Sequence, residues 1–191
     1  MKSSKNIAWS FLLLVVIAAV YRIIPGRPFG FAPQWAMAIF AGAVIRDKKW
    51  AFIIPVLSMF VSDLLYQVLY INGATGIPGF YEGQWQNYVL FTLLVFVGRA
   101  VRKINILQIA GASLAAPTLY FLVSNFLVWA SNGTTRGLDR PKTFNGLMQC
   151  YSDAIPFYRT SILATFVFSA ILFGSYLLIR NAQVTGERVG A

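Results

Sequence analysis

The chain has 191 residues, of which 58% are hydrophobic and only 12% are charged, and its net charge is +10. So few charged residues cannot cover a soluble globule of this size, and lipid must therefore cover much of the surface. The absence of histidine excludes His-based metal sites, and the single cysteine excludes an intramolecular disulfide. Nucleic acid is not needed to explain the charge, because the basic residues gather at the ends of apolar segments.

Six apolar segments, separated by Gly, Pro, Asn and charged residues, predict membrane-spanning helices. They lie at about 7–24, 33–46, 50–71, 85–101, 105–130 and 154–179. We expect an all-α membrane protein, a bundle of six transmembrane helices that forms a single transmembrane domain over residues 1–191. The first segment has the basic start of a signal peptide but no clean cleavage site, so we interpret it as a retained helix.

Basic residues predict how these helices are oriented. Most of them lie on one side of a six-span arrangement: Lys2, Lys5, Arg46, Lys48, Lys49, Arg99, Arg102, Lys103, Arg180 and Arg188. The positive-inside rule makes this side cytoplasmic and places both termini in the cytoplasm. Apolar helices are typical of proteins of the inner-membrane type. The three long loops on the other side, 25–32, 72–84 and 131–153, are then expected to carry the specific function.

Asp63 is the most unusual residue in the apolar segments, because an ionised carboxylate there is costly unless it is paired or faces water. Tyr66 and Gln67 follow it on the same helical face. A contact with a substrate or cation and a structural ion pair are both open as explanations.

Asn125 and Trp129 lie one turn apart near the outer end of the fifth segment. They are expected either to line a cavity that opens outward or to make an interhelical hydrogen bond and an interfacial aromatic contact.

The longest outer loop ends at a group of reactive and polar residues, with Cys150 and Tyr151 at the mouth of the sixth helix. Asp153, just before Pro156, predicts an N-cap. Arg159 must extend outward or pair with an acid such as Asp63 or Asp153. Cys150 is expected either to pack as a small apolar residue or to border a substrate entrance.

Small residues four positions apart allow helices to approach closely. They occur at Ala38/Gly42, Gly111/Ala115 and Ala112/Ala116. Internal packing and docking of another membrane subunit are both compatible with this spacing. Catalysis is not expected, because the sequence has no histidine, no Gly-x-Ser-x-Gly motif and no metal-ligand cluster. We likewise expect no cofactor and no bound metal.

The runs FGFAPQWAMAIFAGAVI, PVLSMFVSDLL, FLVSNFLVW and GLMQCYSDAIPFYRTSILATFVFSAILFG resemble the bacterial DUF6580 family of membrane proteins over most of the chain. The resemblance implies a transport protein of the bacterial inner membrane. The six-helix plan is also similar to the substrate-binding S components of energy-coupling factor transporters. That likeness implies an outward pocket for a vitamin and a separate energising transmembrane subunit with ATPases. The first helix lacks the Ala-x-x-x-Ala docking spacing of those proteins, so the coupling to ATPases stays open.

The function expected from these features is capture of a small-molecule substrate, a vitamin-like micronutrient such as cobalamin, by a transport protein embedded in the lipid bilayer. The alternative is a non-transporting scaffold or assembly subunit of a larger membrane complex. The expected substrate-binding residues are Trp35, Asp63, Tyr66, Gln67, Asn125, Trp129, Cys150, Tyr151 and Arg159.

Overall fold

The computed structural model describes residues 13–131 and 140–189, with side chains placed up to residue 182. An N-terminal helix, Leu13–Arg22, is followed by five more. These are α2 (Gln34–Val44), α3 (Lys48–Ile71), α4 (Trp85–Arg99), α5 (Ile106–Ala130) and α6 (Phe144–Val189). The described ranges contain no strand, which confirms the all-α prediction. The part of the first expected segment before residue 13 lies outside the described residues.

Within the described residues, three helices are long and apolar enough to cross a membrane: Lys48–Ile71, Ile106–Ala130 and Phe144–Ala182. They indicate a membrane protein. By contrast, α2 has 11 residues and is about 16 Å long at 1.5 Å per residue, roughly half of a 30 Å hydrocarbon core. It cannot cross a bilayer alone.

The short helix α2 lies at the centre of the molecule and contacts α3, α4, α5 and α6. Every residue from Ala36 to Gly42 is buried. A helix that is apolar on all faces has no side suited to water, so it is stable when other helices surround it. The aromatic ring of Phe40 packs on Phe173 of α6, with ring centroids 5.2 Å apart.

Two glycines allow α2 and α4 to approach closely. A Cβ atom on Gly42 would lie 2.3 Å from the Val95 carbonyl oxygen, and one on Gly98 would lie 2.2 Å from that of Ile39. The Ala38/Gly42 pair therefore serves internal packing. Ala112 and Ala116 are buried as well, whereas Gly111 and Ala115 lie on the exposed face of α5.

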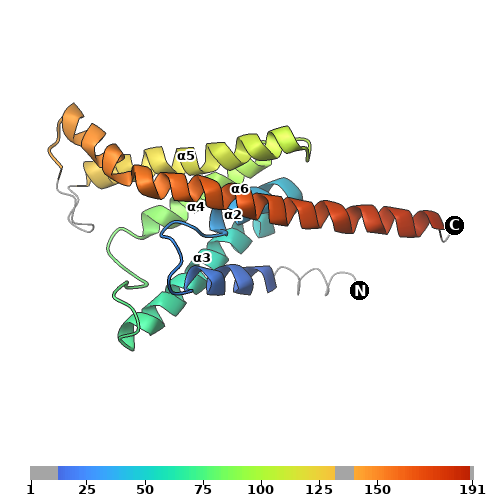
Figure 1. Cartoon of the computed structure of the whole chain (residues 1–191), viewed down its shortest axis with the longest axis horizontal. Coiled ribbons are helices and arrows are strands. Elements are labelled where there is room, and N and C mark those ends of the chain that lie inside the picture. Colours follow the sequence, from blue (N-terminus) through green and yellow to red (C-terminus); the bar gives the residue numbers. More distant parts are fainter. Residues whose placement is uncertain (1–12, 132–139, 190–191) are drawn as a thin grey trace.

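The sixth helix begins at Phe144, ten residues before the expected start at 154. Thr143 caps it, since its Oγ1 accepts a hydrogen bond from the Gly146 N–H at 3.2 Å. Pro156, which predicted a first helical turn, lies inside the helix instead. The first part of α6, in orange in Figure 1, is inclined to the red remainder, as an internal proline would explain.

This longer helix corrects the positions of several residues. Cys150, Tyr151 and Asp153 belong to α6 and not to a loop. Asp153 was predicted as the N-cap, and this is wrong: its carboxylate instead pairs with Arg140, whose Nε lies 3.0 Å from Oδ2. With 46 residues, α6 is about 69 Å long, and its C-terminal part extends beyond the other helices (Figure 1).

Candidate functional site

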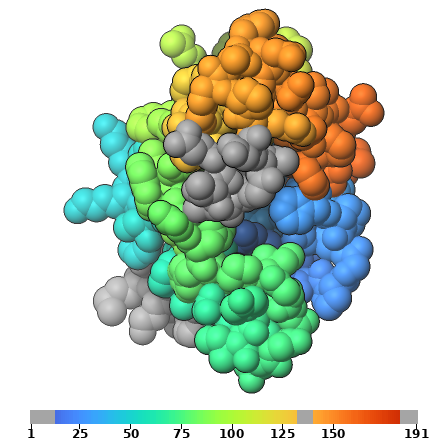
Figure 2. Space-filling model, turned by 90° about the vertical axis from the view of Figure 1, so that its left-hand side faces the viewer, coloured from blue at the N-terminus to red at the C-terminus, as the bar shows by residue number. Residues whose placement is uncertain are grey.

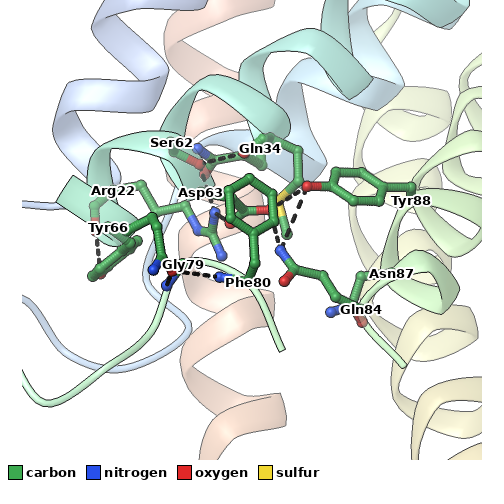
Figure 3. A network of polar contacts seen from close by, with 12 residues as sticks. Arg22, Gln34, Ser62, Asp63, Tyr66, Gly79, Phe80, Gln84, Asn87 and Tyr88 are labelled. Atoms are coloured by element: carbon green, nitrogen blue, oxygen red, sulfur yellow. Dashed lines mark hydrogen bonds and ion pairs between the residues drawn. The ribbon is translucent and has the colours of Figure 1, made fainter. Parts of the chain in front are cut away.

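The carboxylate of Asp63 is the centre of a buried polar network formed by Arg22, Ser62, Asp63, Gln84 and Tyr88 (Figure 3). Asp63 is only 1% exposed. Its Oδ1 accepts a charged hydrogen bond from Nη1 of Arg22. Its Oδ2 accepts two more, from Gln84 Nε2 at 2.5 Å and from the Tyr88 hydroxyl at 2.8 Å. Three donors from other elements thus replace the water that this carboxylate loses on burial.

Arg22, the last residue of the N-terminal helix, is held from both sides. Its Nη1 also donates to Ser62 Oγ at 2.5 Å, and its guanidinium carbon lies 5.4 Å from the centre of the Tyr66 ring. The backbone carbonyl of Arg22 accepts from the Tyr66 hydroxyl and from Nη2 of Arg27, both at 2.8 Å. The guanidinium of Arg22 is therefore held in position against the Asp63 carboxylate.

Gln67, one turn after Asp63, fastens the segment between α3 and α4. Its Oε1 accepts from the backbone N–H groups of Gly79 and Phe80, at 3.1 and 3.2 Å. A Cβ atom on Gly79 would lie 1.9 Å from the Asp63 carbonyl oxygen. Only glycine permits this contact between the segment and α3.

A cavity of about 230 Å³ lies beside the network, between the beginning of α4 and the end of α5. Its lining residues are Tyr81, Glu82, Gly83, Trp85, Gln86, Asn87, Leu90, Ser124, Val128 and Ser131. We refer to it as the α4–α5 cavity. Figure 2 shows the end of the molecule that carries residues 72–90, in green, and the start of α6, in orange.

The segment from 81 to 88 contributes some residues to the network and others to the α4–α5 cavity. Gln84 and Tyr88 bond to Asp63, while Tyr81 and Asn87 line the cavity. Gln84 Oε1 also accepts from the Tyr81 N–H at 3.1 Å. Asn87 donates to the Tyr81 hydroxyl and accepts from the Tyr120 hydroxyl at 2.8 Å. A displacement of Asp63 would therefore also displace the cavity lining, because Gln84 and Tyr88 lie in the same segment as the lining residues.

One amide and one hydroxyl side chain of the described lining are available to a ligand. Gln86 and Ser124 make no side-chain hydrogen bond with the described part of the chain. Pockets of this kind combine an apolar wall, here from Leu90 and Val128, with a few converging polar groups.

A second polar group joins the end of α5 to the start of α6. Trp129 donates from Nε1 to the Pro141 carbonyl at 2.9 Å, and Lys142 lies over its ring. Tyr151 donates to the Leu122 carbonyl at 2.9 Å, and the buried Cys150 donates from Sγ to the Asn125 carbonyl at 3.5 Å. These bonds satisfy groups within the protein and hold α5 and α6 together.

The nine expected binding residues are thus not brought together. Asp63, Tyr66 and Gln67 meet at the network, and Asn125, Trp129, Cys150 and Tyr151 meet at the α5–α6 contact. Trp35 packs on Tyr120 with ring centroids 4.7 Å apart. None of the nine is among the residues that line the α4–α5 cavity.

Arg159 was expected either to extend outward or to pair with Asp63 or Asp153, and the pairing is wrong. Asp63 pairs with Arg22, and Asp153 pairs with Arg140. Arg159 is exposed on α6, not directed inward.

The pairing of Asp63 with Arg22 was not predicted, although the sequence contained a signal for it. Arg22 lies within the expected span 7–24, as Asp63 lies within 50–71. Two opposite charges inside spans are expected to pair, because each is costly alone. Gln84 and Tyr88 carried no comparable signal, since polar residues near the end of an apolar segment are common.

The part of the chain with described side chains has no group of three or more His, Cys, Asp or Glu residues that could hold a metal ion. Comparison with protein families matches residues 2–186 to a model described as a family of unknown function, DUF6580. No curated protein and no solved structure matches the chain.

Proposed function

The chain belongs to the DUF6580 family, whose function is unknown, and we propose that it captures a small micronutrient-like molecule in the α4–α5 cavity for transport and catalyses no reaction. The observation that carries this proposal is the cavity itself. Gln86 and Ser124, whose side chains make no hydrogen bond with the described residues, line it together with the apolar side chains of Leu90 and Val128. This combination is typical of small-molecule sites.

The size of the cavity limits the size of the ligand that it can hold. Its volume of about 230 Å³ is below the roughly 300–1,000 Å³ of pockets for drug-sized ligands. A small vitamin or vitamin precursor is therefore favoured over cobalamin.

In the proposed topology the chain crosses the bacterial inner membrane six times, both termini are cytoplasmic, and the cavity opens outward. Residues 25–33 and the 11-residue α2 would together make the second crossing. Irregular backbone is tolerated at membrane depth where protein surrounds it. Here Arg27 donates to the carbonyls of Arg22 and Phe31, at 2.8 and 2.7 Å.

The Asp63 network has a positioning role in this proposal. It connects the N-terminal helix, α3 and the segment 81–88, whose other residues line the cavity. Ligand binding and the relative placement of these elements would then be linked, as capture and release in a transporter require.

A scaffold function is the second candidate, favoured by the exposed pair Gly111/Ala115 on α5. A Cβ atom on Gly111 would meet nothing within 4 Å, so this face is open to another helix.

The two candidates are separated by filling the cavity. We expect a library of small water-soluble metabolites to contain at least one that raises the melting temperature of the purified protein, and Ser124→Phe to abolish that shift. Ser175→Phe, at an exposed position on α6, is the matched control and should keep it. A library without any stabilising compound, together with co-purification of a membrane partner that Gly111→Leu removes, would favour the scaffold.

A further inference from the structure

We infer that the ligand of the α4–α5 cavity is a small organic cation, an amine that carries a flat ring. This inference rests on the proposed function and concerns the same cavity. Three observations support it: the charge of the lining, the hydrogen bonds already made by N–H groups at the beginning of α4, and the aromatic side chains at the cavity.

The charge of the lining comes from one residue. Among the described lining residues, Glu82 is the only one with a charged side chain. Within the described part of the chain, its carboxylate has neither an ion pair nor a hydrogen bond. This contrasts with the acids at 63 and 153, which both pair with an arginine. An unpaired carboxylate at a cavity attracts a cation through its local negative potential.

The beginning of α4 does not offset this preference. A helix N-terminus usually attracts anions through its free N–H groups. Here the N–H of Gln86 donates to the Gly83 carbonyl at 3.1 Å, and that of Asn87 donates to the Gln84 carbonyl at 2.9 Å. These two donors are therefore not available to an anion.

Aromatic side chains supply the second half of the site. Trp85 is 65% exposed, and its indole N–H makes no hydrogen bond with the described residues. Tyr81 lines the cavity beside Glu82. The faces of such rings attract cations and stack on flat groups. A carboxylate and two aromatic side chains in the lining of one cavity suit a ring-bearing amine better than a sugar or an anion.

The test compares three probes of nearly equal shape and different charge: phenethylamine, 2-phenylethanol and phenylacetate. Their binding to the full-length protein in nanodiscs is measured by titration calorimetry. We expect phenethylamine to bind about tenfold more tightly than 2-phenylethanol, which corresponds to ~1.4 kcal/mol, and phenylacetate to bind most weakly.

The variant Glu82→Gln should remove the preference for phenethylamine and leave the melting temperature of the free protein unchanged, because Glu82 is exposed. Asp47→Asn is the matched control. It also removes one negative charge, but at the start of α3, where asparagine can still cap the helix. It should keep the preference.

Equal binding of 2-phenylethanol, tighter binding of phenylacetate, or no saturable binding of any probe would each overturn the inference. A preference for phenethylamine that survives Glu82→Gln would overturn it as well. None of these results would decide the capture function, which is judged separately by the metabolite library and Ser124→Phe.

Discussion

The guanidinium of Arg22 and the carboxylate of Asp63 form an ion pair between residues 41 positions apart in the chain. The Asp63 side chain is 2% exposed and that of Arg22 is 22% exposed. Asp63 lies eight residues before the end of α3 at Ile71, which is about 12 Å along the helix. The pair thus fixes the end of the N-terminal helix against the interior of α3.

Removing one member of this pair should lower the free energy of unfolding more than removing both members. Asp63→Asn leaves the Arg22 cation without a counter-charge. The new Nδ2 group is a donor, and it would face at least one of the donors that now bond to the carboxylate, from Arg22, Gln84 and Tyr88. Breaking a buried pair in this way costs roughly 3–5 kcal/mol, and we expect the lower end because Arg22 is partly exposed. The measurement is unfolding of the purified protein by denaturant in detergent.

The double variant Arg22→Gln/Asp63→Asn should recover part of that loss, since no charge is then left unpaired. Strict additivity of the two single variants would show that the pair does not stabilise the fold as argued here.

Gly79→Ala should destabilise the protein and weaken ligand binding in the cavity. The added Cβ would lie 1.9 Å from the Asp63 carbonyl oxygen and 2.4 Å from the Gln67 nitrogen, so the segment before α4 must move away from α3. Such overpacking costs about 1–3 kcal/mol. Gly76→Ala is the matched control, because a Cβ there meets nothing within 4 Å. Equal melting temperatures for the two variants would contradict the close packing of Gly79 on α3.

Cys150 should react slowly with a membrane-impermeant maleimide in intact cells. Its side chain is 1% exposed and bonds to the Asn125 carbonyl, which favours the packing role over a substrate entrance. Ser131→Cys in a Cys150→Ala background serves as the positive control, since Ser131 is exposed at the cavity. Rapid labelling of Cys150 that bound ligand slows would restore the entrance hypothesis.

The six-span topology predicts that a reporter fused after Arg180 is cytoplasmic. A reporter in the turn at 46–50 should be cytoplasmic as well, and one at 76 should be periplasmic. The turn at 46–50 and residue 76 lie on opposite sides if α3 crosses the membrane. With a cytoplasmic N-terminus, a cytoplasmic signal at 46–50 also requires that residues 25–33 and α2 together complete a crossing. A periplasmic signal from the fusion after Arg180 would require an odd number of crossings.

Local properties of the sequence determined which segments are helical. Four expected segments, 33–46, 50–71, 85–101 and 105–130, agree with α2 to α5 within two residues at each end. Apolar length and the residues that interrupt it are readable within a window of about 20 residues, as is the all-α, membrane character. The predicted start of α6 was wrong because it used the same local information. Asp153 and Pro156 have the residue types of a helix start, but Thr143 caps the helix.

Only the tertiary structure decided which residues meet. The pairing of Arg22 with Asp63 joins positions 41 apart, and that of Asn87 with Tyr120 joins positions 33 apart. The α4–α5 cavity likewise takes residues from two helices and the segment before α4. Helix periodicity places a side chain on a face, but the partner of that face depends on how the helices pack. Packing here follows from close approaches such as Gly42 on Gly98, which arise only when distant segments fold together.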